Sequence, residues 1–285
     1  MLMSIFGLHA QKTFLQSEWR DSSITIDGSA ADWHPPFNYS DSKIKSQLSI
    51  RNDSSFLYVC LRTSDQQTQM KITRAGMTVG FDMRGGKKQS SAVGFPLPSS
   101  FTMEMPEPGS EEQPKRPDMQ KIKMEVLAAM KDMHIQKMLN IPDGDLPLDN
   151  PLDIRAAINW DTDNILSYEL KIPFGVFYKE TITAQDTVKA MSLFITINGI
   201  NLPAPPAGMD ASDGGNSGSP GMGGIGGPPG GGGMGGPPAG GMGGPPGGGM
   251  GGAQGGDAGI PPGVSHMMEM SKSQETMFRF KLSYR

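Results

Sequence analysis

The sequence predicts an all-β protein, an antiparallel β-sandwich of the jelly-roll or immunoglobulin-like kind. Short runs of alternating apolar and polar residues recur along the chain, and turn residues separate them. The regular alternation of strands and helices that marks a parallel sheet is absent. One inserted amphipathic helix and one long Gly/Pro/Met-rich segment interrupt the strands, so we expect a single sandwich domain over residues 20–285.

The N-terminal residues predict export. Residues 2–8 form a short apolar run that ends in His-Ala-Gln, which resembles the end of a secretory signal peptide cleaved after Ala10. We interpret residues 1–10 as a truncated signal peptide and expect a protein of the periplasm, the outer surface or the extracellular space. No apolar run reaches the roughly 20 residues of a membrane span. The net charge of -4, with Lys and Arg scattered, argues against a nucleic-acid partner.

The first sandwich element is expected at residues 24–33. Ile24 and Ile26 alternate as in a short strand, an Asp-Gly pair favours a turn, and Trp33 stands shortly before two prolines. We expect this stretch to cover one end of the sandwich, with the Trp33 indole either in the core or against a ligand.

Four further strands precede the insertion, and they are expected at residues 47–50, 56–62, 77–82 and 91–97. Pro96 would confine the last of them to a sheet edge, because proline has no backbone N–H to donate. Cys60 lies within an apolar run, so we expect it to be a buried and inert thiol.

Residues 98–150 are expected to be an insertion made of a Pro-rich loop and a helix. Apolar residues recur at spacings of three and four from Met119 to Met133, which predicts an amphipathic helix over 118–139 with Asp118 as its N-cap. We expect its methionine-rich face to pack against a sheet edge.

The remaining strands are expected at 154–160, 166–173, 191–197 and 276–284, the first two as a hairpin. Most of the 39 glycines lie in residues 203–264, between the last two strands. This segment contains too little apolar surface to offset its chain entropy, so it is expected to be a disordered low-complexity loop.

Five short motifs occur in an order that resembles family 9 carbohydrate-binding modules and the related DOMON-like domains. They are ITIDGSAADW at 24–33, FLYVCLRTSD at 56–65, MTVGFDMRG at 77–85, YELKIPF at 168–174 and FITING at 194–199. The resemblance implies a β-sandwich of secreted bacterial proteins that binds sugars, or haem in some DOMON relatives.

The resemblance therefore implies a non-catalytic module that recognises a glycan or another cell-surface polymer, and no catalytic motif is present in the sequence. Two places where sugar-binding relatives carry aromatic residues, 71–75 and 203–264, contain none here. An envelope structural or protein-interaction module therefore stays an alternative. A haem or copper-binding domain is a third hypothesis, the copper ligands being His266, Met267, Met268 and Met270.

Two tryptophans and one turn are the candidate sites. Trp160 ends a strand beside a polar turn, where its ring could stack on a sugar, and Trp33 is the second candidate ligand contact. Asp161, Asp163 and Asn164 offer oxygen ligands at short spacing, so this turn is either a structural calcium site or an ordinary hairpin turn. No other cofactor is expected.

Overall fold

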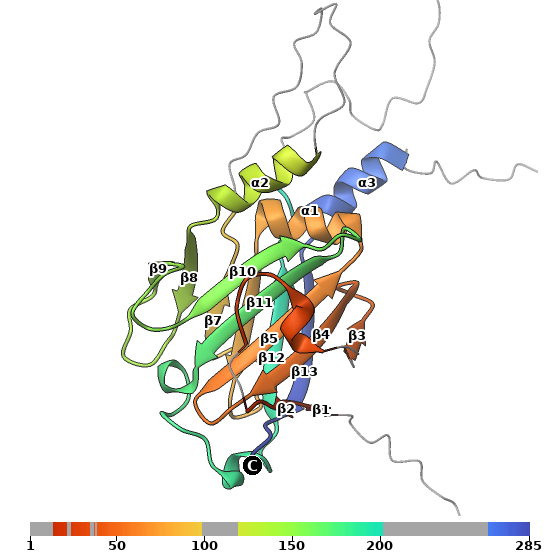
Figure 1. Cartoon of the computed structure of the whole chain (residues 1–285). Helices are drawn as coiled ribbons and strands as arrows, with labels where there is room; N and C mark the ends of the chain where they lie inside the picture. The colour runs from red at the N-terminus through yellow and green to blue at the C-terminus, as the bar shows by residue number, and fades with distance from the viewer. Residues whose placement is uncertain (1–13, 22–23, 35–36, 38, 99–118, 202–261) are drawn as a thin grey trace, which may run out of the picture. The chain divides into compact units, whose positions relative to one another are not determined.

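The computed structural model describes residues 14–21, 24–34, 37, 39–98, 119–201 and 262–285, and its strands form two facing sheets (Figure 1). In this part of the chain sheet A has seven strands and sheet B has six. The predicted β-sandwich is therefore confirmed. The signal peptide expected at 1–10, the Pro-rich part of the insertion with Asp118, and the predicted loop as far as residue 261 lie outside the described residues.

Sheet A runs in the order β1 (Leu15–Gln16), β13 (Gln274–Lys281), β12 (Met191–Ile197), β6 (Met77–Asp82), β7 (Ser91–Gly94), β8 (Asp132–Gln136) and β9 (Gly144–Pro147). Sheet B runs in the order β10 (Arg155–Trp160), β11 (Leu166–Pro173), β5 (Phe56–Thr63), β4 (Ser46–Asn52) and β2 (Glu18–Trp19), and β3 (Tyr39–Asp41) also pairs with β4. The described strands pair antiparallel, except for β1 with β13 and β2 with β4. β1 and β2 place strands ahead of residue 20, where the domain was expected to begin.

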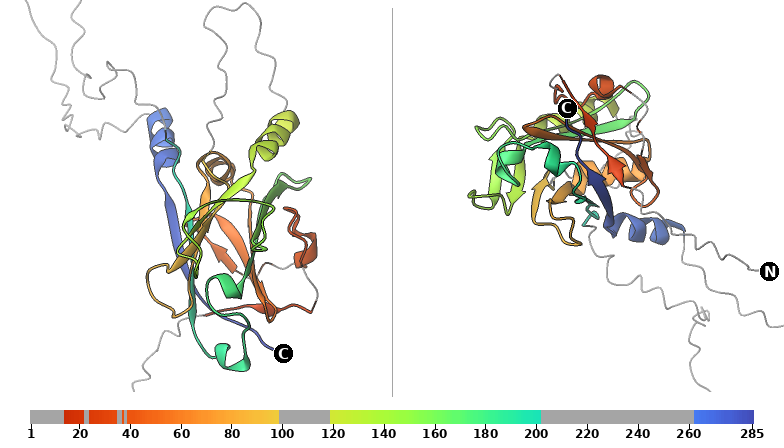
Figure 2. Two further views of the ribbon diagram at one scale, coloured as in Figure 1. Left: turned by 90° about the vertical axis from the view of Figure 1, so that its left-hand side faces the viewer. Right: turned by 90° about the horizontal axis from the view of Figure 1, so that it is seen from below.

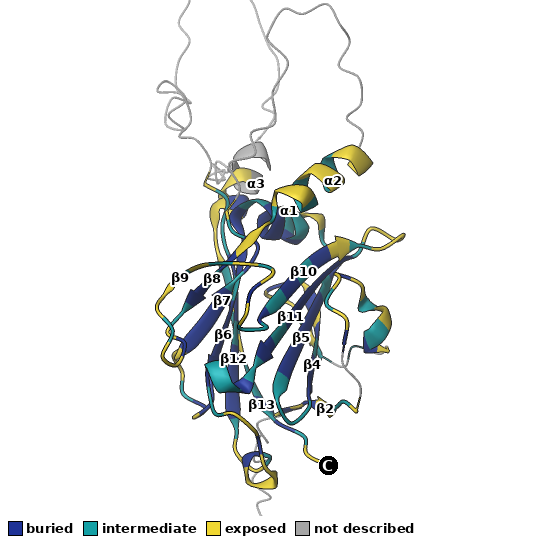
Figure 3. Ribbon diagram, turned by 60° about the vertical axis from the view of Figure 1, so that its left-hand side comes forward, coloured by how far each residue is buried: buried dark blue, intermediate teal, exposed yellow. Residues whose placement is uncertain are grey.

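The main core lies between the two sheets and follows from the alternation of side chains along each strand. In β5, Leu57, Val59 and Leu61 point inward and are fully buried. Val79 and Phe81 of β6 meet them from the opposite sheet, and both sheets are buried over most of their length (Figure 3). Burial of this apolar surface is the main stabilising contribution to the fold.

Residues 24–33 cover the outer face of sheet B, so the expectation that they cover one end of the sandwich is wrong. Tyr58 and Cys60 point outward from β5, and Ile24 and Trp33 pack against them. The predicted strand at the start of this stretch is also absent from the described residues, and its last four residues form a short 3-10 helix, η1 (Ala30–Trp33). Burial raises the pKa of the Cys60 thiol, which keeps it protonated.

The carboxylate of Glu169 on β11 fixes this covering segment. Its Oε1 accepts a hydrogen bond from Trp33 Nε1 at 2.5 Å, and its Oε2 accepts from the amides of Asp27 at 3.0 Å and Gly28 at 2.6 Å. Gly28 has a φ of +81°, and a Cβ there would lie 2.5 Å from the backbone of Ile158, so glycine is required. Burial raises the pKa of Glu169 to about 7, against the opposing effect of the three donors.

A helix that the sequence pattern does not predict, α1 (Gln66–Ala75), connects β5 to β6. Most of its residues are polar, so its apolar periodicity is weak. Local capping defines it instead, because Asp65 accepts a hydrogen bond from the Thr68 amide at 2.9 Å and Gly76 follows the last turn with a φ of +83°. Ile72 packs downward into the main core.

The prediction of one helix over 118–139 is wrong in its second half. The helix, α2, spans Met119–Ala129, and β8 and β9 follow as a hairpin. Met133 and Ile135 are buried while their neighbours in β8 are not, which is the period of a strand. Because Met130 and Met133 are also three residues apart, the helical pattern continues in the sequence beyond the point where the helix ends.

Two smaller corrections concern the strand ends. β7 ends at Gly94, before Pro96, and pairs with both β6 and β8, so Pro96 does not place it at an edge. The final strand begins at Gln274 and follows a third helix, α3 (Pro262–Ser271), which includes the last residues of the predicted loop. No helix among the described residues has the length and apolar character needed to cross a membrane.

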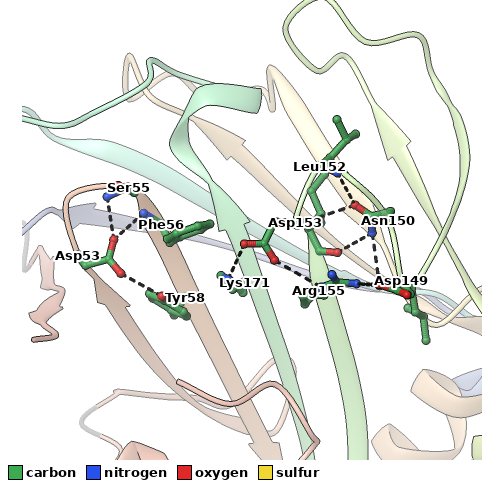
Figure 4. Close-up of polar contacts among 12 residues, drawn as sticks. Asp53, Ser55, Phe56, Tyr58, Asp149, Asn150, Leu152, Asp153, Arg155 and Lys171 are labelled. Carbon is green, nitrogen blue, oxygen red and sulfur yellow. Dashed lines mark hydrogen bonds and ion pairs between the residues drawn. The ribbon is translucent and has the colours of Figure 1, made fainter. Parts of the chain in front are cut away.

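Two carboxylates organise the turns at the end of sheet B away from α1 (Figure 4). Asp53 accepts hydrogen bonds from two backbone amides of the turn that follows it and from the Tyr58 hydroxyl at 3.0 Å. Asp153 pairs with Lys171 at 2.7 Å and with Arg155 at 3.4 Å. These contacts hold the turns at this end of the sheet in place.

Replacement of Trp33 tests the covering segment. We expect Trp33→Ala to lower the free energy of unfolding by about 3–5 kcal/mol, because the ring is buried and its N–H bonds a buried carboxylate. Trp19→Ala is the matched control and should cost less, since Trp19 is only half buried at a sheet edge. Urea denaturation measures both, and equal losses would contradict this assignment.

The raised pKa of Glu169 predicts a pH dependence of stability. The native state keeps a proton on Glu169 up to about pH 7, whereas the unfolded chain releases it near pH 4.5. As the pH rises from about 4.5 to about 7, the free energy of unfolding should therefore fall, and this group should contribute on the order of 3 kcal/mol to the loss. Glu169→Gln cannot titrate, so its profile should be flatter than the wild-type profile; parallel profiles would contradict the shift.

Candidate functional site

A cleft of about 640 Å³ is lined by residues of α1, α2 and the β10–β11 turn. These elements lie at one end of the sandwich (Figures 1 and 2). We call this space the α1–α2 cleft. Its size is typical of sites that bind small ligands. It is lined by Ser64, Gln66, Gln69, Met70, Thr73 and Arg74 around α1, by Met119, Ile122, Lys123 and Val126 of α2, and by Trp160, Asp163 and Asn164.

The indole of Trp160 is held in one orientation at the wall of this cleft. Trp160 faces the same side of β10 as the buried Ile158 and contacts the edge of the main core, where it is half buried. Its Nε1 donates to Gln69 Oε1 at 3.0 Å. Gln69 in turn donates to the carbonyls of Thr63 at 2.9 Å and Asn164 at 2.8 Å, so the amide that holds the ring is itself fixed.

Lys123 connects α2 to this wall. Its Nζ lies 5.0 Å from the centroid of the Trp160 ring and donates to Asn164 Oδ1 at 2.7 Å. α2 has no fully buried residue, and Leu127 is the residue within it that packs, partly buried, against the core (Figure 3). A helix with so little buried surface opens at low cost. The cleft therefore has one rigid wall and one movable wall.

Two charged groups that line the cleft have no partner among the described residues. Arg74 lies in the last turn of α1 and Asp163 in the β10–β11 turn. Among the described residues, neither side chain forms a hydrogen bond or an ion pair with another. The cleft thus combines an aromatic ring, amides, hydroxyls and charges of both signs: Arg74 and Lys123 are cationic, and Asp163 is anionic.

The predicted calcium ligands all lie in the β10–β11 turn, but the structure uses most of their oxygens. Asp161 Oδ1 accepts from the amides of Asp163 at 3.0 Å and Ile165 at 2.9 Å, and its Oδ2 pairs with Arg62 at 2.6 Å. Asn164 Oδ1 accepts from the lysine of α2. The described residues contain no group of three or more His, Cys, Asp or Glu side chains arranged to hold a metal ion. Calcium binding at this turn stays a prediction.

The other predicted site residues lie away from the cleft. Trp33 is 1% exposed beneath η1, so no face of its ring is open to a ligand. On α3, Met267 and Met268 are about half exposed while Met270 is buried. The side chain of His266 is outside the described residues, and copper or haem binding stays a prediction.

Gln69 and Arg74 are the cleft residues that sequence reasoning missed, because the helix that carries them was not predicted. The signal was local: Asp65 and Thr68 have the spacing of an N-cap interaction, and Ala75-Gly76 is a typical helix end. With α1 in place, Trp160 would have been expected to meet a helix rather than solvent.

No model of a known protein family matches the chain, and no curated protein matches it. Among solved structures, two of a carbohydrate binding module family 9 (CBM9) from Caldicellulosiruptor kristjanssonii match, one in complex with cellotriose and one with glucose. Each is 10% identical to this chain in sequence and has a TM-score of 0.30. Each match covers 66% of this chain, and it covers 78% of the cellotriose-bound chain and 80% of the glucose-bound chain. The likeness is thus distant and concerns the fold, so function has to be inferred from the cleft.

Replacement of Lys123 tests whether α2 is a movable wall. We expect Lys123→Ala to speed amide hydrogen exchange in residues 119–129 by roughly two- to fivefold, the equivalent of one exposed cation–π contact. The melting temperature should stay nearly unchanged. Lys121→Ala, in the same helix and 71% exposed at its side chain, is the matched control. Equal exchange rates in the two variants would contradict the role of Lys123.

Proposed function

We propose that the protein is a non-catalytic, exported binding module that holds a neutral glycan in the α1–α2 cleft. The observation that carries this proposal is the Trp160 indole, fixed by Gln69 at the cleft wall. The apolar face of a sugar ring stacks on an indole, while its hydroxyl groups exchange hydrogen bonds with amides and charged side chains around the ring. Gln69, Asn164, Asp163 and Arg74 supply such groups here.

The rigidity of Trp160 favours this function. A ring that is already oriented loses little conformational entropy when a ligand stacks on it. Lys123 lies over the ring in the free protein, so a sugar that stacks from the cleft displaces the ammonium group. The displaced Lys123 ammonium group can then donate hydrogen bonds to hydroxyl groups of the ligand. Helix α2 can shift to make room, because little of it is buried.

The charges of the cleft argue against a polyanionic ligand. Arg74 and Asp163 offer one charge of each sign, Lys123 adds a second positive charge that already donates to Asn164, and the whole chain carries a net charge of -4. A polyanion would need a cluster of cationic groups with no facing carboxylate. Hydroxyl groups, which both donate and accept, satisfy both side chains at once.

A protein-interaction module is the second candidate function. Met119 and Met124 of α2 are 57% and 64% exposed, and Met70 of α1 is 43% exposed. Exposed methionines form adaptable apolar surfaces that accept partner helices. In this case the cleft and α2 would bind an apolar protein segment, and the contribution of Trp160 would be packing alone.

A glycan array followed by isothermal titration calorimetry tests the first candidate. We expect wild-type protein to bind a neutral glycan, and Trp160→Ala to weaken binding about thirtyfold, as for an aromatic contact worth about 2 kcal/mol. Trp19→Ala is the control, because Trp19 lies on β2 and packs against Tyr284, away from the cleft. Circular dichroism verifies that each variant is folded.

Two outcomes contradict the proposal. If no neutral glycan binds at millimolar concentration, or if Trp160→Ala binds as tightly as the wild type, the cleft is not a sugar site. Retention of an amphipathic helical peptide that Met119→Glu abolishes would then support the second candidate.

A further inference from the structure

Two further cavities lie in a row with the α1–α2 cleft. A middle cavity of about 240 Å³ shares the lining residues Thr73 and Val126 with the cleft. A far cavity of about 520 Å³ shares Leu97 and Pro98 with the middle one. Each space is thus the neighbour of the next, and a ligand that passed over the shared residues would follow one path.

The path leads from the β10–β11 turn, past α2, to the outer face of sheet A. The strand register shows this, because one row of paired residues crosses β6, β7, β8 and β9. The row consists of Thr78, Gly94, His134 and Asp145. A Cβ on Gly94 would lie 3.6 Å from the His134 Cβ and 3.7 Å from Thr78 Oγ1, so these residues share one face. Gly94 leaves the floor of the far cavity open.

The far cavity presents polar groups that can bind a ligand. His134 Nδ1 lies 2.7 Å from Asp145 Oδ1, which orients the imidazole and leaves Nε2 free to bond a ligand. In the described part of the chain, the side chains of Thr78 and Gln136 form no hydrogen bond. Hydroxyl, amide and imidazole groups on rigid strands bind neutral hydroxylated ligands well.

The middle cavity limits what can fill the whole path. Its volume is the smallest of the three and lies below the range of sites that enclose a drug-sized ligand. Lys131 and Asp132 line it with one charge of each sign. A ligand that occupies all three spaces is therefore extended, with little bulk in its middle part.

We propose that the three cavities form one groove for an extended, unbranched neutral polysaccharide, with Trp160 at one end and the His134–Asp145 pair at the other. This inference rests on the proposed function and specifies its ligand: a chain of several sugar units rather than a single sugar or a chain end. Units beyond the first gain contacts in the middle and far cavities.

Oligosaccharides of increasing length test the groove. The probes are β-1,4-linked oligomers of glucose, xylose and N-acetylglucosamine, each from the monosaccharide to the hexasaccharide, measured by titration calorimetry. We expect affinity to rise with length. Gly94→Val, which fills the floor of the far cavity, and His134→Ala should each weaken hexasaccharide binding about tenfold and leave disaccharide binding unchanged. Trp160→Ala should weaken both.

Gly144→Val is the matched control for Gly94→Val. It adds the same side chain to the same sheet at a position with nothing within 4 Å and outside the three cavities. It should bind every oligomer like the wild type, and thermal melting verifies that both variants fold.

The outcomes separate this inference from the proposed function. Affinity that stops rising at the disaccharide, or hexasaccharide binding unaffected by both Gly94→Val and His134→Ala, overturns the extended groove while the Trp160 site stands. Binding that depends on Gly94 and His134 but not on Trp160 overturns both the site at the α1–α2 cleft and the groove of three cavities. Failure of every oligomer to bind overturns both.

Discussion

Strand β5 has to be buried on both of its faces, and the rest of the arrangement follows from that constraint. Its inward residues meet sheet A, but Tyr58 and Cys60 leave an apolar strip on the outer face of sheet B. Residues 24–33 cover this strip, and their backbone amides would be buried without partners unless a group on the sheet accepted them. Glu169 supplies that group by accepting from three donors of one segment, and these donors only partly offset the burial that raises the pKa of its carboxyl group.

This cover determines where a ligand can bind. Arg51, 4% exposed, lies over the Trp33 ring and donates to the carbonyls of Asp32 and Trp33, so both faces of the covering segment are engaged. The part of the outer face of sheet B around Tyr58 and Cys60 is therefore closed. The α1–α2 cleft opens instead at the end of the sandwich, where α1 is packed into the core and α2 is not. A rigid helix beside a loosely held one gives a cleft that keeps its recognition groups in place and adapts its width.

The strands could be predicted because each face of a strand meets a different environment. In β10, alternation in the sequence matched alternation in burial, whereas β5 was predicted from a continuous apolar run, as is typical of a strand buried on both faces. The helix α1 could not be predicted from periodicity, since its stability comes from caps and from Ile72 in the core. The end of α2 near Met130 was missed because the apolar residues there are spaced both three apart, as in a helix, and two apart, as in a strand. At the site, Trp160 was predicted from its turn, whereas Gln69 depended on the missed helix.

The two tryptophans illustrate how the partner of an indole N–H decides what the ring can do. Trp33 donates to Glu169, which also accepts from the amides of Asp27 and Gly28, so the segment that carries Trp33 is held against the sheet and the ring is 1% exposed. Trp160 donates to Gln69, a side chain at the wall of the cleft. The first hydrogen bond is therefore part of a network that buries the ring and stabilises the fold. The second permits partial exposure, and it leaves an oriented aromatic surface at the wall of the cleft.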